Sequence, residues 1–192
     1  MKKIILLILA ILLLSCTSLL AKVTYVSYKN EVTHISQYNT GTYSNDNCGI
    51  ASLKMVLDFI DVEVGSVSEL RNQIKNRSGW IYTDELESYM DSRSISYEIE
   101  WLDNKEVIKK CLDDGILLMC LDMSRVSAPY SNVTGHFIVI VGYYMDDRGE
   151  WLEVYDPAVY KTQYYKLDEV YQSANDWCGY MYHFKQNKSP LN

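Results

Sequence analysis

The chain has 192 residues and a formal net charge of −7 at pH 7. Beyond the N-terminal segment it contains no run of lysine or arginine, and contacts with nucleic-acid phosphates require clustered cations, so the composition argues against nucleic-acid binding. About 170 residues remain once that segment is set aside, a length that fits one domain with one core.

The first 21 residues have the character of a secretory signal. Two lysines precede an apolar run over 4–14, which is shorter than the roughly 20 residues that a membrane-spanning helix needs. The letters LLSC at 13–16 resemble the lipobox of bacterial lipoproteins, which predicts lipidation of Cys16. Cleavage after Ala21 and a retained signal anchor are the alternatives. Each outcome places the mature domain, taken as 22–192, outside the cytoplasm as a cell-envelope lipoprotein or a secreted protein.

The most informative segment is NDNCGIAS at 45–52, where a cysteine stands between a polar loop and an apolar-periodic run. The apolar residues recur at helical spacing, which predicts a helix over 48–60 with Asp46 or Asn47 as its N-cap. Cys48 then lies among unpaired backbone N–H groups, at the positive end of the helix dipole. Both effects favour a thiolate, so Cys48 is the candidate nucleophile.

Helices precede strands along the rest of the chain, and this order predicts an α+β fold. Two more helices are expected early, one from the capping box Ser66–Glu69 to about Asn76 and one over 84–91 with Thr83 as its cap. Strands are expected over 23–26, 95–101, 116–121, 136–144, 150–155 and 178–184, with further helices over 104–112 and 167–174. Alternating apolar residues indicate that strand 95–101 is half-buried, and the continuous apolar run at 116–121 indicates a central strand.

A histidine and an aspartate stand at the ends of two neighbouring predicted strands. His136 opens the strand 136–144, and Asp156 follows the strand 150–155 across a turn at 146–149. Pairing about this turn brings Asp156 near Val139, three residues from His136. A cysteine nucleophile needs a base within hydrogen-bond reach, and the base needs a third group that orients it. His136 and Asp156 are the candidates for these two roles.

Three blocks of sequence resemble the bacterial papain-fold cysteine peptidases. They are DNCGIAS at 46–52, GHFIV at 135–139 and VYDP at 154–157. The family is typified by the double-glycine leader peptidases of bacteriocin export, and the chain is more similar to their standalone secreted relatives. The resemblance implies a papain-like α+β fold, with the nucleophile on a helix N-terminus packed against an antiparallel sheet. It also implies an extracytoplasmic cysteine peptidase that acts on a peptide or protein through Cys48, His136 and Asp156.

The oxyanion donor departs from the pattern of that family. The resemblance implies a glutamine that commonly lies six residues before the cysteine, and here that position is Thr42. Gln37 lies eleven residues before the cysteine, where a longer loop can deliver it to the site. Asn39 and Asn45 are the substitutes. The backbone N–H of Cys48 is expected to be the second donor.

Two other functions stay open at this point. The same triad can serve an amidase or acyltransferase, and a papain-fold module without activity can bind a peptide or a cell-wall component. No Gly-x-x-x-x-Gly-Lys-Ser/Thr loop occurs, so no ATP and no other cofactor is expected. The cysteines at 111, 120 and 178 are expected to be structural and not in disulfides. The histidines at 34 and 183 are expected to be structural. The absence of a CxxC pair gives little support for a metal site.

Overall fold

The computed structural model describes residues 25–130 and 133–186, and the predicted signal segment with Cys16 lies outside them. Within these residues no helix combines the length and the apolar character needed to cross a membrane. The elements are β1 (Tyr25–Ser27), η1 (Ser44–Asp46), α2 (Cys48–Phe59), α3 (Val67–Ile74), α4 (Thr83–Ser92), β2 (Glu98–Trp101), α5 (Glu106–Cys111), β3 (Gly115–Leu121), η2 (Met123–Arg125), β4 (His136–Asp146), β5 (Gly149–Tyr155), β6 (Gln163–Lys166), α6 (Leu167–Trp177) and β7 (Tyr180–Lys185).

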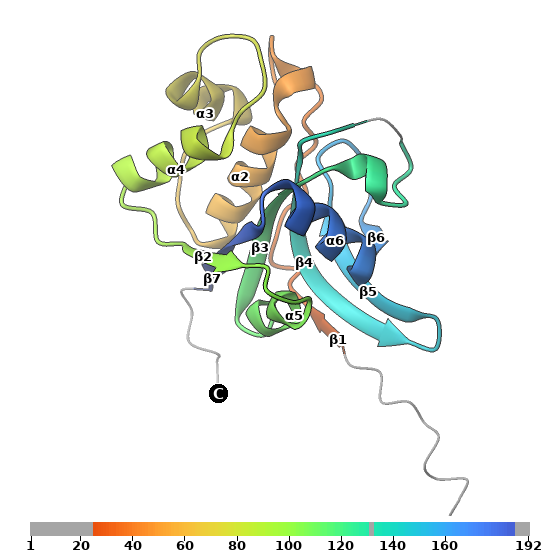
Figure 1. Ribbon diagram of the computed structural model, residues 1–192. Coiled ribbons are helices and arrows are strands. Elements are labelled where there is room, and N and C mark those ends of the chain that lie inside the picture. The colour runs from red at the N-terminus through yellow and green to blue at the C-terminus, as the bar shows by residue number, and fades with distance from the viewer. Residues whose placement is uncertain (1–24, 131–132, 187–192) are drawn as a thin grey trace, which may run out of the picture.

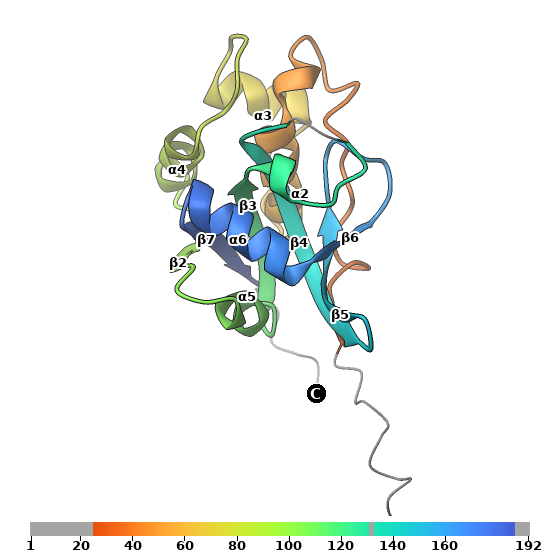
Figure 2. The same cartoon turned by 45° about the vertical axis from the view of Figure 1, so that its right-hand side comes forward.

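One antiparallel sheet, covered by helices on both faces, organises the described chain. Its strand order is β2-β7-β3-β4-β5-β6, and β1 pairs with the second half of β4. Helix α2 lies behind the sheet together with α3 and α4, whereas α6 crosses in front of it and α5 lies near its lower end (Figures 1 and 2). Phe137 and Val139 of β4 face the core beneath α2, and Ile138 and Ile140 face the core beneath α6. Two buried faces explain why the central strands have continuous apolar sequences.

Most predicted helices form, with ends that move by a few residues. The capping box before α3 is confirmed, because the Glu69 N–H donates to Ser66 Oγ at 3.2 Å and the Ser66 N–H donates to Glu69 Oε2 at 2.7 Å. The predicted cap of α4 is wrong, since Thr83 is already its first residue. Tyr82 takes the N-cap position, and its backbone N–H donates to Glu85 Oε2 at 3.0 Å.

The two edge strands β2 and β6 differ most from the prediction. Strand β2 begins at Glu98 rather than at residue 95, and Ile99 and Trp101 are 41% and 63% exposed instead of half-buried. Ile95 and Tyr97 still pack on the core before the strand begins, whereas the described sheet pairs β2 only with β7 and leaves Ile99 and Trp101 exposed at its edge. Strand β6 was not predicted, because its sequence QYYK is too short to show a period of two.

A β-bulge in the hairpin of β4 and β5 changes the position of Asp156. Near the turn the two strands follow the predicted register, up to the pair Gly142 and Glu153. The register then shifts by one residue, so that Val139 pairs with Tyr155 instead of Asp156. Asp156 therefore lies one position nearer to His136 than a regular hairpin would place it. Bulges commonly re-aim a side chain next to a functional site.

Candidate active site

Cys48 opens α2 and borders a cleft of about 380 Å³. The next residue lets α2 approach the start of β4 closely, since a Cβ on Gly49 would lie 3.1 Å from the ring of Phe137. One turn later the Ser52 hydroxyl donates to the carbonyl oxygen of Phe137 at 3.1 Å. These contacts fix the helix N-terminus against His136. The cleft is lined by Gln37, Tyr38, Asn45, Cys48, Trp80, Val133, Thr134, Gly135, His136 and Ala158.

The structure brings the three predicted triad residues together. His136 Nε2 lies 2.8 Å from Asp156 Oδ1, and the imidazole interacts with the Cys48 thiol. With Nε2 engaged by the carboxylate, Nδ1 is the nitrogen left for the sulfur. His136 is 3% exposed and Asp156 is fully buried, so water does not compete for the hydrogen bond between them.

Two tyrosines that the sequence did not single out hold the Asp156 carboxylate. Asp156 Oδ2 accepts from the Tyr130 hydroxyl at 2.5 Å and from the Tyr165 hydroxyl at 2.8 Å. Asp156 Oδ1 accepts from the Ala158 N–H at 2.9 Å in addition to His136. Burial raises the pKa of Asp156, but the His136 hydrogen bond and charge, the Tyr130 hydroxyl and the Ala158 N–H outweigh it, and the net pKa is lowered. The buried group is therefore a carboxylate.

The electrostatics of Cys48 and His136 favour a thiolate–imidazolium pair. Burial raises the pKa of Cys48, but the hydrogen bond and charge of His136 and the backbone N–H groups of Phe137 and Gly49 lower it below its ordinary value. Burial lowers the pKa of His136, but hydrogen bonds to Asp156 and Cys48 and the charges of both raise it above its ordinary value. Each group thus stabilises the charged form of the other.

Gln37 lies at the same cleft as Cys48, despite the longer loop between them. Its backbone N–H donates to the Pro157 carbonyl at 2.8 Å, which anchors it beside Asp156. Its side chain is 5% exposed, and Nε2 donates to the Asn45 carbonyl at 3.1 Å. The second contact of Nε2, to the Ser44 carbonyl, is long at 3.4 Å, so one amide N–H is only weakly engaged. Asn45 also lines the cleft, whereas Asn39 and Thr42 do not.

A buried arginine supports the loop that precedes Cys48. Arg71 is 1% exposed and donates to Asn47 Oδ1 at 3.3 Å and to the Gly79 carbonyl at 2.7 Å. Asn47 Nδ2 in turn donates to Thr40 Oγ1 at 2.9 Å. The side chain of Asn47 is therefore occupied, and although Asn47 has the N-cap position of α2, its side chain makes no cap hydrogen bond. The predicted cap is wrong in this respect. Asp46 does not cap the helix either, because its Oδ2 accepts from the Gly79 N–H.

The other cysteines lie in different surroundings from Cys48. All four cysteines of the described chain are free thiols. Burial, together with Glu100 and Asp114, raises the pKa of Cys111 to about 11. The thiols of Cys120 and Cys178 contact each other, and this hydrogen bond together with burial raises the pKa of Cys120.

An apolar pocket of about 190 Å³ adjoins the cleft and shares Trp80 and Gly135 with it. Trp177 closes the pocket and lies over Gly135, where a Cβ would be 3.0 Å from the indole. Gly135 also has a φ of +66°, which disfavours other residues there. The GH pair at the start of β4 thus combines a backbone requirement at Gly135 with the candidate base His136.

Comparisons with known proteins agree with this architecture. The sequence model described as the Peptidase_C39 like family matches residues 29–182. The crystal structure of a candidate C39-like peptidase from Bacillus anthracis superposes with a TM-score of 0.64 at 14% sequence identity, covering 86% of this chain and 100% of that one. A comparison with curated protein sequences gave no match. The papain-like α+β fold predicted from the sequence is confirmed by the family match and the superposition.

Proposed function

Because the chain belongs to the Peptidase_C39 like family, we propose that it is a cysteine peptidase that works through Cys48, His136 and Asp156. The Cys48 thiolate attacks the peptide carbonyl carbon, and the oxyanion forms against the Cys48 N–H and Gln37. His136 then gives its proton to the leaving amine and afterwards activates the water that releases the acyl group. The observation that carries this proposal is the buried hydrogen bond between Asp156 and His136, together with the interaction of the His136 imidazole with the Cys48 thiol.

The shape of the cleft supports a peptide substrate. It is open to solvent beside Cys48 and continues past Gly135 into the apolar pocket. Two indoles flank this path, with Trp80 58% exposed and Trp177 48% exposed. Large exposed aromatic side chains beside a nucleophile suit the side chains of an extended peptide, because each offers apolar area with little loss of rotamer freedom.

A thiol-directed active-site probe tests the proposal. We expect Cys48 to react at pH 6, since its pKa lies below the ordinary value near 8.5. His136→Ala removes the group that lowers this pKa and leaves burial, which raises it. Labelling at pH 6 should therefore fall by about 10-fold or more, because a smaller fraction of the thiol is ionised.

The control for this labelling is Cys178→Ser, because Cys178 is half-exposed and lies in the adjoining pocket. Mass spectrometry of peptides locates the label. Labelling of Cys48 that is equally fast with and without His136 would contradict the proposed pair and favour a papain-fold module that binds without catalysis.

Replacement of Gln37 tests the oxyanion assignment. Gln37→Ala should lower kcat by about 10²-fold, the loss typical for removal of one oxyanion donor. Asn45→Ala is the matched control, because Asn45 lines the same cleft but is exposed and contributes its backbone carbonyl to Gln37. Normal turnover in Gln37→Ala together with a loss in Asn45→Ala would transfer the role to Asn45.

We further propose that the mature protein acts outside the cytoplasm and is held at the membrane by lipid on Cys16. The support is the apolar run followed by LLSC at 13–16. Several acyl chains anchor a protein stably, whereas one binds only marginally. Cys16→Ala should therefore release the protein from membranes or block its processing. A mature N-terminus at Lys22 would rule this proposal out.

A further inference from the structure

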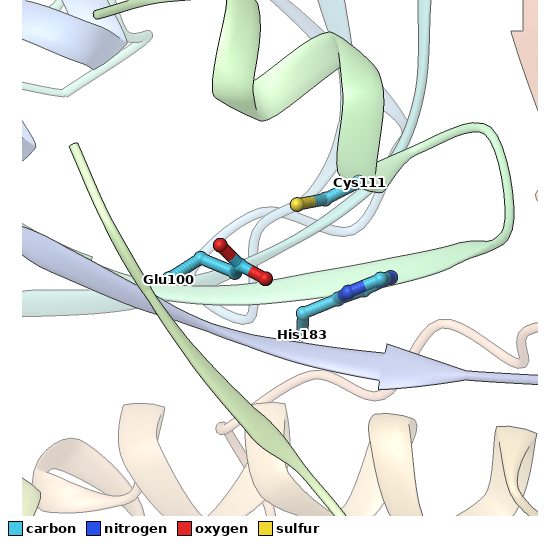
Figure 3. A group of neighbouring side chains, drawn as sticks. All are labelled: Glu100, Cys111 and His183. Atoms are coloured by element: carbon cyan, nitrogen blue, oxygen red, sulfur yellow. The ribbon is translucent and has the colours of Figure 1, made fainter. Parts of the chain in front are cut away.

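A second cluster of reactive side chains lies away from the cleft. Glu100 of β2, Cys111 at the end of α5 and His183 of β7 point toward one another, and their ligand atoms all lie within 4.8 Å (Figure 3). His183 pairs with Leu117 of β3, whereas His136 pairs with Leu121. Four residues of β3 separate the two levels, or about 13 Å of strand. The cluster is therefore distinct from the triad.

The imidazole of His183 is buried without a hydrogen-bond partner in the described chain. The residue is 2% exposed, and neither ring nitrogen makes a hydrogen bond. Asp114 Oδ1 approaches Nε2 to 3.0 Å and Glu98 Oε2 approaches Nδ1 to 3.7 Å, but neither contact has hydrogen-bond geometry. A buried polar group without a hydrogen-bond partner destabilises the folded state. A ligand on the ring would remove this destabilisation.

The charge around His183 favours a cation. Three carboxylates surround the cluster. Among the described residues, Lys185 pairs with two of them, at 2.8 Å to Glu98 and at 4.0 Å to Asp114, and Lys110 adds a positive charge near Cys111. Within the described residues Glu100 forms no ion pair. Its carboxylate is thus left to interact with whatever binds between Cys111 and His183.

We propose that Glu100, Cys111 and His183 bind a divalent transition-metal ion of the Zn²⁺ type, with Asp114 or water as the fourth ligand. Thiolate, imidazole and carboxylate are the three ligand types that Zn²⁺ takes in proteins, at about 2.3, 2.0 and 2.1 Å. These lengths require the ligand atoms to close somewhat, which the half-exposed side chain of Glu100 allows. Cys111 is 5% exposed and gives its thiol proton to solvent as it binds.

The bound ion would join the short helix α5 to the paired strands β2 and β7. Glu100 is on the edge strand β2, Cys111 ends the short helix α5, and His183 is on β7. A metal site of this kind stabilises the folded state, because the unfolded chain does not present the ligands together. The spacing of 11 and 72 residues between the ligands matches no short metal motif, so this site could not be predicted from the sequence.

Zn²⁺ titration of a Cys48→Ala, Cys178→Ser protein tests this site. The two substitutions remove the candidate nucleophile and one of the two neighbouring thiols Cys120 and Cys178, which could otherwise bind Zn²⁺. Calorimetry should show one Zn²⁺ per chain, and Co²⁺ in its place should give a thiolate-to-metal absorption band. Glu100→Gln and Cys111→Ser should each weaken Zn²⁺ binding by at least about 10-fold, since loss of even an outer partner of a ligand costs 10–100-fold. Cys111→Ser should also abolish the Co²⁺ band.

Glu106→Gln is the matched control, because Glu106 is an acidic residue on the same helix as Cys111 but pairs with Lys109. It should bind Zn²⁺ as the parent does. Zn²⁺ should raise the melting temperature of the parent and of Glu106→Gln, but not of Glu100→Gln. Absence of a one-to-one complex would overturn the proposal, as would binding that both Glu100→Gln and Cys111→Ser leave unchanged. If Cys111→Ser does not fold, Zn²⁺ binding by Glu100→Gln still tests the proposal, because Glu100 is partly exposed and its replacement should leave the fold intact. None of these outcomes depends on peptidase activity.

Discussion

Cys48→Ala should lower kcat/KM for a cleaved peptide by at least about 10⁴-fold, because it removes the nucleophile and leaves only the oxyanion donors and substrate binding. A peptide library first identifies a substrate of the wild-type protein, and the two proteins are then compared on that peptide. The fold should not change, since Cys48 is half-buried and alanine favours the first turn of α2. Matching circular dichroism spectra would confirm this.

Cys48→Ser is the control for size and polarity in the same experiment. The serine hydroxyl fits the space of the thiol but is not ionised by His136. The activity of the Cys48→Ser protein should therefore also be low. A Cys48→Ala protein that cleaves the peptide at the wild-type rate would remove Cys48 from the reaction. Products that carry an added amine acceptor instead of a new carboxylate would identify the same thiol chemistry as acyl transfer.

The positions of the candidate nucleophile and the candidate base could be predicted from the sequence, because local rules set both. A helical period begins directly after Cys48, and a continuously apolar strand begins at His136, so each residue could be placed at the end of its element. The hairpin turn then limited the distance of Asp156 from His136. These inferences need only helix spacing, strand pairing and turn chemistry.

The groups that support the candidate triad could not be predicted from the sequence, because their positions depend on contacts between residues far apart in the chain. Tyr130 is in a polar loop and Tyr165 is in a short edge strand, and nothing local to either residue indicates a bond to Asp156. Arg71 has the sequence context of a surface residue on α3, yet it is buried against the loop before Cys48. The same reason applies to His183, whose neighbours come from β2 and α5.

Replacement of Asp156 separates its charge from its hydrogen bonds. Asp156→Asn keeps an acceptor for His136, and the Tyr130 and Tyr165 hydroxyls can turn to accept from the new amide, so the fold should persist. Loss of the negative charge should lower kcat/KM by about 10²-fold. In a serine triad the matching change costs about 10⁴ because it traps the wrong tautomer. Here the tyrosines favour the amide orientation that keeps the tautomer correct, and the thiolate depends less on assistance from the base.

Asp156→Ala should have the larger effect, about 10³-fold on kcat/KM, with a destabilisation of about 3–5 kcal/mol, since it leaves buried donors from four residues without an acceptor. Chemical denaturation measures the second quantity.

The pH profile distinguishes a positioning role of Asp156 from a purely structural one. Asp156 raises the pKa of His136, so loss of its charge must lower that pKa. Activity requires the protonated imidazole, and it is lost as pH rises through that pKa. The alkaline limb of kcat/KM should therefore move to lower pH in Asp156→Asn. Tyr165→Phe is the matched control, because it removes one hydrogen bond to Asp156 without removing charge, and its alkaline limb should move less. A folded Asp156→Asn protein with an unmoved alkaline limb and normal turnover would exclude Asp156 from the triad, and the orientation of His136 would then rest on other contacts.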